Sequence, residues 1–144
     1  MNEETYVPSD PELRSILGDA RTVAVVGLSS NPGRPSYEIA EYLQSKGYRI
    51  VPVNPKETEV LGERAYPTLA DIPADVEVDV VDVFRRAEFT PEIAQAAVAR
   101  GAKVLWLQEG ISNDEARQIG EDGGLSVVMG VCMRQESRRL EGET

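Results

Sequence analysis

Residues 22–36 combine the features that most directly suggest a binding function. A short apolar run ends at Gly27, continues as a small polar loop and enters a predicted helix at Ser36. A buried strand that leads into such a turn directs backbone N–H groups and a helix N-terminus toward one point, which favours a phosphate. The spacing from Gly27 to Gly33 matches neither the dinucleotide-binding Gly-x-Gly-x-x-Gly motif nor the Walker P-loop. The loop therefore predicts an anionic ligand of unspecified type, and the alternative is a strand-to-helix turn that binds nothing.

Arg34 and several small polar residues add hydrogen-bonding groups to this loop. Arg34 lies between two prolines, and the second, Pro35, suits the first position of a helix, where no backbone hydrogen bond is lost. We expect the guanidinium to meet a phosphate near the helix terminus; the alternative is that it points into solvent. Four further side chains of the loop can donate hydrogen bonds to the same point: Ser29, Ser30, Asn31 and Ser36.

Asn54-Pro55-Lys56 follows the second predicted strand and discriminates between nucleotides. A NAD site usually has an acidic residue here, which binds the adenine ribose hydroxyls. A lysine would instead attract a phosphorylated ribose, such as those of NADP and coenzyme A. Lys56 therefore favours these two ligands over NAD, unless it is one solvated surface lysine among many.

Phe84-Arg85-Arg86 follows the third predicted strand. An aromatic ring with two guanidinium groups can cover a nucleotide base or a pantetheine arm. In the alternative interpretation, Phe84 completes the core and the arginines pair with acids such as Asp82 or Glu88.

The last two strand ends carry weaker signals. Gln108 and Glu109 form a polar pair in the expected cleft, whereas Trp106 is interpreted as a core residue. Cys132 follows the fifth predicted strand near a helix N-terminus, a position that lowers a thiol pKa. Because no histidine is available to pair with it, we expect a structural thiol and not a nucleophile.

The composition narrows the classes of function. The 144 residues include no histidine and one cysteine, and the formal net charge is −10. Without histidine there is no Ser-His-Asp triad, Cys-His pair or histidine metal ligand, so we predict no catalytic residue and no metal site. The acidic charge argues against binding of nucleic acid or anionic membranes. No apolar stretch approaches the ~20 residues of a membrane span, and the first residues lack a signal-peptide pattern, so we expect a cytoplasmic protein.

Strand and helix patterns alternate along the chain with short joins, which predicts an α/β fold: a single Rossmann-like, doubly wound parallel sheet with helices on both faces. Five strands are expected, at residues 22–28, 48–53, 78–84, 103–107 and 125–129. We predict the strand order 3-2-1-4-5, with the first strand central because its run Val23-Ala-Val-Val26 is continuously apolar. Ligands of such sheets bind beyond the carboxyl ends of the strands, which is where the candidate residues lie.

Taken together, these strand ends resemble the small coenzyme A-binding proteins, a bacterial and archaeal family of single Rossmann-like domains. Their fold is similar to the N-terminal domain of the succinyl-CoA synthetase alpha subunit. The resemblance covers residues 10–140, and these segments carry it: residues 25–32, 34–36, 47–55, 80–85, 101–103, 106–108 and 110–111, with Cys132 and Glu136.

The resemblance implies that Leu28–Pro32 would hold the pyrophosphate of the coenzyme and that Asn54–Lys56 would lie near its adenosine and 3′-phosphate. Leu107-Gln108-Glu109 resembles the synthetase segment that contacts the coenzyme. Family members often carry an acid and a histidine where this chain has Gly130 and Ser137, so roles that need those side chains are not implied. Ligase activity is not implied either, because the synthetase's phosphorylated histidine belongs to a further domain.

These observations predict one coenzyme A-binding domain over residues 1–144, which binds coenzyme A or an acyl-CoA without strong catalysis. The alternatives are an NADP-linked oxidoreductase, an acyl-CoA-processing enzyme that uses Cys132 or Glu109, and an interaction protein with a vestigial pocket. No protein partner, acyl group or oligomeric state is implied. The expected ligand contacts are Gly27, Leu28, Ser29, Ser30, Asn31, Pro32, Arg34, Ser36, Asn54, Pro55, Lys56, Phe84, Arg85, Arg86, Leu107, Gln108 and Glu109.

Overall fold

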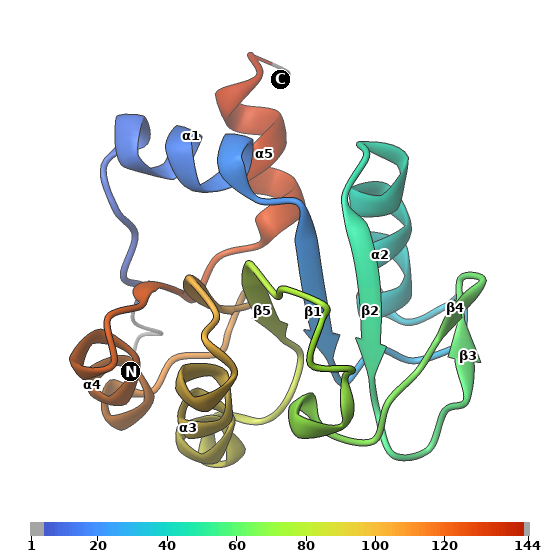
Figure 1. Ribbon diagram of the computed structural model, residues 1–144. Helices are drawn as coiled ribbons and strands as arrows, with labels where there is room; N and C mark the ends of the chain where they lie inside the picture. The colour runs from blue at the N-terminus through green and yellow to red at the C-terminus, as the bar shows by residue number, and fades with distance from the viewer. Residues whose placement is uncertain (1–4, 143–144) are drawn as a thin grey trace.

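Five parallel strands form the central sheet of the protein, as predicted (Figure 1). The computed structural model describes residues 5–142, so most of the N-terminal segment considered for a signal peptide lies outside it. The strands run in the order β2-β1-β5-β6-β7. Their bounds are β1 (Thr22–Val26), β2 (Arg49–Val53), β5 (Val80–Val83), β6 (Val104–Leu107) and β7 (Ser126–Met129).

Helices cover both faces of the sheet. Successive residues of each strand point to opposite sides, so each face presents apolar side chains that the helices bury. One face is covered by three helices: α1 (Asp10–Asp19), α2 (Pro35–Ser45) and α5 (Met133–Leu140). The other face is covered by two: α3 (Thr90–Arg100) and α4 (Asp114–Asp122). An apolar cluster lies on each face. Val25 and Trp106 belong to the cluster under α1, α2 and α5, and Val26 and Leu105 belong to the cluster under α3 and α4. None of the helices within residues 5–142 is long and apolar enough to cross a membrane.

The helix ends follow the capping residues in the sequence. Ser9 caps α1, where its hydroxyl accepts a hydrogen bond from the Glu12 backbone N–H at 3.3 Å. Asn113 caps α4, where its side chain accepts a hydrogen bond from the Ala116 N–H at 2.8 Å.

The predicted strand order was wrong for the strand at residues 78–84. We expected it outside the second strand, but β5 lies between β1 and β6 and is the middle strand of the sheet. β1 is an interior strand, as predicted, although it is not the middle one. The alternation of Val and Asp in this segment does not mark a solvent-facing side, because all four residues of β5 are buried, including Asp82.

No α-helix connects β2 to β5. The connection contains a short antiparallel pair, β3 (Glu59–Val60) and β4 (Glu63–Arg64), and the 3₁₀ helix η1 (Leu69–Asp71). It carries the chain from edge strand β2 back past β1 to β5. The strand order therefore reverses between β1 and β5, and at such a reversal α/β sheets form a crevice for ligands.

Candidate functional site

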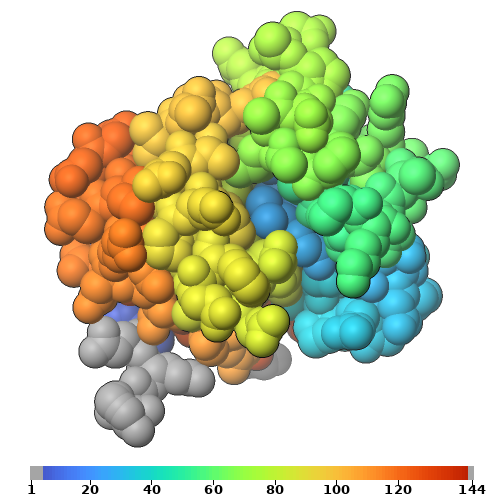
Figure 2. Space-filling model, turned by 90° about the horizontal axis from the view of Figure 1, so that it is seen from below, coloured from blue at the N-terminus to red at the C-terminus, as the bar shows by residue number. Residues whose placement is uncertain are grey.

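The loops that follow the strands surround a recess at the carboxyl edge of the sheet. In Figure 2, which looks onto this edge, the dark blue chain at the end of β1 lies in the hollow, between the green chain after β2 and the yellow chain after β5. Two cavities occupy the region, with volumes of about 560 Å³ and 320 Å³. Arg85 lines both of them, so one side chain stands between the two. Their sizes are within the range of small-molecule sites.

Most of the predicted contact residues after β2, β5 and β6 line these cavities. The larger cavity is lined by Phe84, Arg85, Arg86, Gln108 and Glu109, and the smaller one by Gly27, Asn54, Pro55, Lys56 and Arg85. The predicted loop residues Leu28, Ser29, Ser30, Asn31, Pro32, Arg34 and Ser36 are not part of either lining. Their loop nevertheless runs from Gly27, at the smaller cavity, to Pro35, at the larger one.

Gly27 is the residue at which the chain turns out of the sheet. Its φ of 89° is in the left-handed region, which favours glycine. A Cβ at this position would lie 2.6 Å from the Phe84 carbonyl oxygen, so the chain after β1 passes directly against the chain after β5. Its N–H donates to the Val53 carbonyl at 2.8 Å, which also ties it to β2. Glycine is therefore required where the three strand ends meet.

The loop after Gly27 is held by hydrogen bonds within itself. The Ser29 N–H donates to Ser36 Oγ at 3.1 Å, and the Asn31 N–H donates to Ser29 Oγ at 3.0 Å. The Gly33 N–H donates to Asn31 Oδ1 at 2.9 Å. Ser36 is buried, and its hydroxyl acts here as an acceptor that fixes the loop. Arg34 is the N-cap of α2, and its side chain makes no capping hydrogen bond there.

Asn54 connects the turn after β2 to the first loop. Its Nδ2 donates to the Leu28 carbonyl at 3.0 Å, and its Oδ1 accepts from the Lys56 backbone N–H at 2.9 Å. Lys56 is exposed, with its backbone fixed by this contact. The next residue, Glu57, was not predicted from the sequence, but its Oε2 accepts a hydrogen bond from the Ser30 N–H at 2.9 Å.

Arg85 and Arg86 stack against the same aromatic ring. Their guanidinium carbons lie 4.7 Å and 5.5 Å from the centre of the Phe89 ring. The alternative in which these arginines pair with Asp82 is wrong, because one Asp82 oxygen bonds Gln108 and the other has no hydrogen-bond partner. Stacking limits the motion of both guanidinium groups and leaves their positive charge at the recess.

The polar pair after β6 separates into two environments. Gln108 is buried and Glu109 is exposed. Leu107, which was also expected to contact the ligand, places its side chain in the apolar cluster beneath α3 and α4. Gln108 Nε2 donates to Asp82 Oδ1 at 2.6 Å. Gln108 therefore lines the larger cavity, and its side chain is held by a hydrogen bond to the buried carboxyl group of Asp82.

Asp82 and Cys132 are the buried titratable groups beside this cavity. Asp82 is fully buried, which raises the pKa of its carboxyl to about 7, although the hydrogen bond from Gln108 acts in the opposite direction. Burial also raises the pKa of the Cys132 thiol, against the effect of the backbone N–H groups at the start of α5. The thiol is therefore protonated at neutral pH. No three Cys, Asp or Glu side chains within residues 5–142 lie close enough to share a metal ion.

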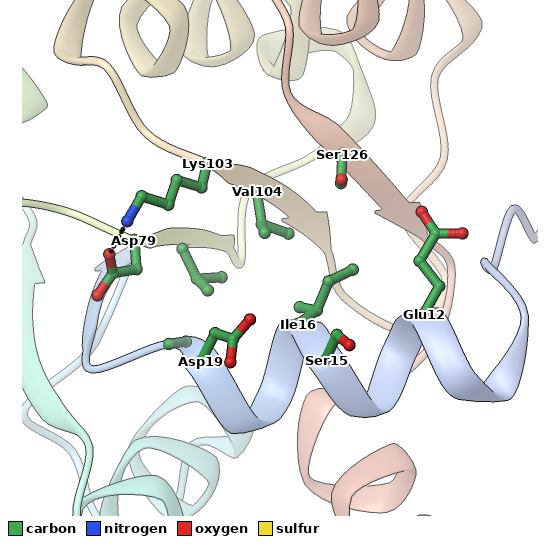
Figure 3. Close-up of a pocket in the computed structure, with 10 residues that line it drawn as sticks. Glu12, Ser15, Ile16, Asp19, Asp79, Lys103, Val104 and Ser126 are labelled. Carbon is green, nitrogen blue, oxygen red and sulfur yellow. Dashed lines mark ion pairs between the residues drawn. The ribbon is translucent and has the colours of Figure 1, made fainter.

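A further cavity, of about 250 Å³, lies at the opposite edge of the sheet, between α1 and the amino ends of β5 and β6 (Figure 3). Ile16 of α1 and Val104 of β6 point toward one another across it. Asp79 is held there by the backbone N–H groups of Arg21 and Thr22, and it pairs with Lys103 at 3.4 Å. None of the predicted contact residues lines this cavity.

The parallel sheet and the recess at its carboxyl edge define a Rossmann-like α/β protein with a candidate ligand site. The model of the CoA binding domain family matches residues 21–138. The chain therefore belongs to the CoA binding domain family, which confirms the resemblance seen in the sequence.

Relatives are found both as small proteins and as parts of larger enzymes. The Bacillus subtilis "Uncharacterized protein YneT" is 40% identical over 127 residues, which cover 88% of this chain and 93% of that protein. The alpha subunit of the ADP-forming acetate–CoA ligase I from Pyrococcus furiosus is 33% identical over 113 residues, 74% of this chain but 23% of the subunit. Among solved structures, a hypothetical protein from Pyrococcus horikoshii has a TM-score of 0.90 and 39% identity, covering 98% of this chain and 100% of that one.

Proposed function

We propose that this protein is a single binding domain that holds coenzyme A or an acyl-CoA across the carboxyl edge of its sheet. The observation that carries the proposal is the pair of adjoining cavities, 320 Å³ and 560 Å³, on either side of Arg85 at the reversal of strand order. Two neighbouring cavities that share a lining residue could hold the nucleotide and the long arm of one ligand. Membership of the CoA binding domain family supports the same ligand.

The residues around the two cavities suggest how the ligand is oriented. The smaller cavity, with Asn54 and Lys56, would take the adenosine and its 3′-phosphate, and the loop after Gly27 would take the pyrophosphate. The larger cavity would take the pantetheine arm, with Arg85 and Arg86 above it and Gln108 beneath. Lys56, Arg85 and Arg86 line these cavities in a chain whose net charge is −10, so the positive charge there favours a phosphorylated ligand.

Calorimetric titration with coenzyme A and with NADP tests the choice of ligand. We expect coenzyme A to bind more tightly than NADP, because the chain belongs to the CoA binding domain family. Native mass spectrometry of the freshly purified protein should show any retained ligand by its mass. Tighter binding of NADP would support the oxidoreductase alternative instead.

Assays with a panel of acyl-CoA thioesters separate a binding domain from an enzyme. We expect no hydrolysis above the uncatalysed rate, because the Cys132 thiol is buried, protonated and without a histidine partner. Turnover that is lost in Cys132→Ala would instead support an acyl-CoA-processing enzyme.

A further inference from the structure

Glu57 makes a contact at the place where an anionic ligand is expected. Its Oε2 accepts a hydrogen bond from the Ser30 backbone N–H at 2.9 Å, although the two residues belong to loops after different strands. The Glu57 N–H in turn donates to the Asn54 carbonyl at 3.2 Å. The Asn54 side chain is bonded to the Leu28 carbonyl on the first loop. The carboxylate is thus fixed at this position by a connected set of hydrogen bonds between the two loops.

A carboxylate and a phosphate compete for such a position. Both are anions that accept hydrogen bonds from backbone N–H groups, and a Ser30 N–H directed at Glu57 cannot also be directed at a phosphate oxygen. Two negative charges at hydrogen-bonding distance from one donor also repel each other. A phosphorylated ligand that uses this loop must therefore displace Glu57.

We propose that Glu57 is an internal competitor for the anion position of the first loop and sets the affinity of that loop for phosphorylated ligands. The inference rests on the proposed function for the identity of the natural ligand, but the competition itself concerns any phosphate at Ser30. In the free protein the carboxylate satisfies the N–H, and on binding it leaves and the pyrophosphate takes its place. Removing the negative charge should then strengthen binding.

A purely structural role for Glu57 predicts the opposite result. If its contact only held the loop in a shape that favours the ligand, losing it would loosen the loop and weaken binding. The direction of the change in affinity therefore distinguishes the two roles, and a change in protein stability alone does not.

The test uses Glu57→Gln, which keeps the size of the side chain and an acceptor oxygen but removes the charge. The matched control is Glu59→Gln, since Glu59 is an exposed carboxylate two residues further on, in β3. Each protein is titrated calorimetrically with inorganic pyrophosphate and with coenzyme A at low and high salt. Thermal unfolding of each variant checks that it is folded, and Glu57→Ala serves as a second variant.

We expect Glu57→Gln to bind pyrophosphate and coenzyme A about 3- to 30-fold more tightly than the wild type, the range for a charged hydrogen bond partly screened by solvent. The gain should shrink at high salt, and Glu59→Gln should stay within about twofold of the wild type. Unchanged or weaker pyrophosphate binding by Glu57→Gln, or no binding by any variant, would overturn the inference. Tighter binding of pyrophosphate without any binding of coenzyme A would uphold the inference and reject the proposed function.

Discussion

At the scale of single residues, Asp82 has a strongly raised pKa. It lies in the middle strand, fully buried, and its Oδ2 has no hydrogen-bond partner. Burial disfavours the charged carboxylate more than the hydrogen bond from Gln108 stabilises it, so the pKa rises from 3.8 to about 7. With a pKa of about 7, this carboxyl is partly protonated at neutral pH.

The raised pKa makes stability depend on pH. Protonated Asp82 contributes fully to stability below pH 3.8, and this contribution is lost as the pH rises through about 7. We expect Asp82→Asn, which cannot ionise, to gain stability relative to the wild type as the pH rises from 3.8 to about 7, by as much as about 4 kcal/mol, and the difference to level off at higher pH. Urea unfolding at several pH values measures the difference. Asp75→Asn, on an exposed loop, should show no such trend, and a flat difference for Asp82→Asn would contradict the assignment.

At the scale of elements, the turn out of β1 depends on a glycine that no other residue can replace without strain. Gly27→Ala would place a methyl group 2.6 Å from the Phe84 carbonyl oxygen at a φ of 89°. We expect a loss in the free energy of unfolding of at least about 2 kcal/mol. Gly18→Ala in α1 is the matched control, because nothing lies within 4 Å of its added Cβ. That change should stabilise the helix by about 0.5–1 kcal/mol, and equal effects of the two substitutions in urea unfolding would refute this view of the turn.

Local patterns in the sequence were sufficient to predict most elements but not their order. The apolar runs of the five expected strands are local signals, and each of these ranges contains one strand of the sheet. The place of β5 depends on pairing between segments far apart in the sequence, with β1 on one side and β6 on the other. The residues of this strand alone do not indicate that it lies in the middle of the sheet.

At the scale of the whole molecule, the topology gathers basic residues that are distant in the sequence. Lys56 and Arg85 line the same cavity because β2 and β5 lie on opposite sides of β1. The amino edge instead presents Asp79 paired with Lys103. The fold therefore separates a basic recess from the remaining surface of an acidic chain.

The same topology explains which parts of the candidate site could be predicted. Residues at strand ends, such as Asn54 and Phe84, were predicted because parallel strands place their carboxyl ends at one edge. Glu57 was missed because its importance comes from a contact with Ser30, 27 positions away in the sequence. Leu107 was included by resemblance, but the alternation of β6 directs its side chain into the core.

The most direct measurement of the central claim compares coenzyme A with its 3′-dephospho form by calorimetric titration. If Lys56 meets the 3′-phosphate, the wild type should prefer coenzyme A by roughly 10- to 150-fold, the effect of a charge-assisted contact. Lys56→Ala should abolish most of that preference, Arg34→Ala should weaken both ligands together, and Lys103→Ala at the amino edge should change neither. Equal affinity of the wild type for both forms would contradict the placement of the adenosine, and no binding of either would contradict coenzyme A as the ligand.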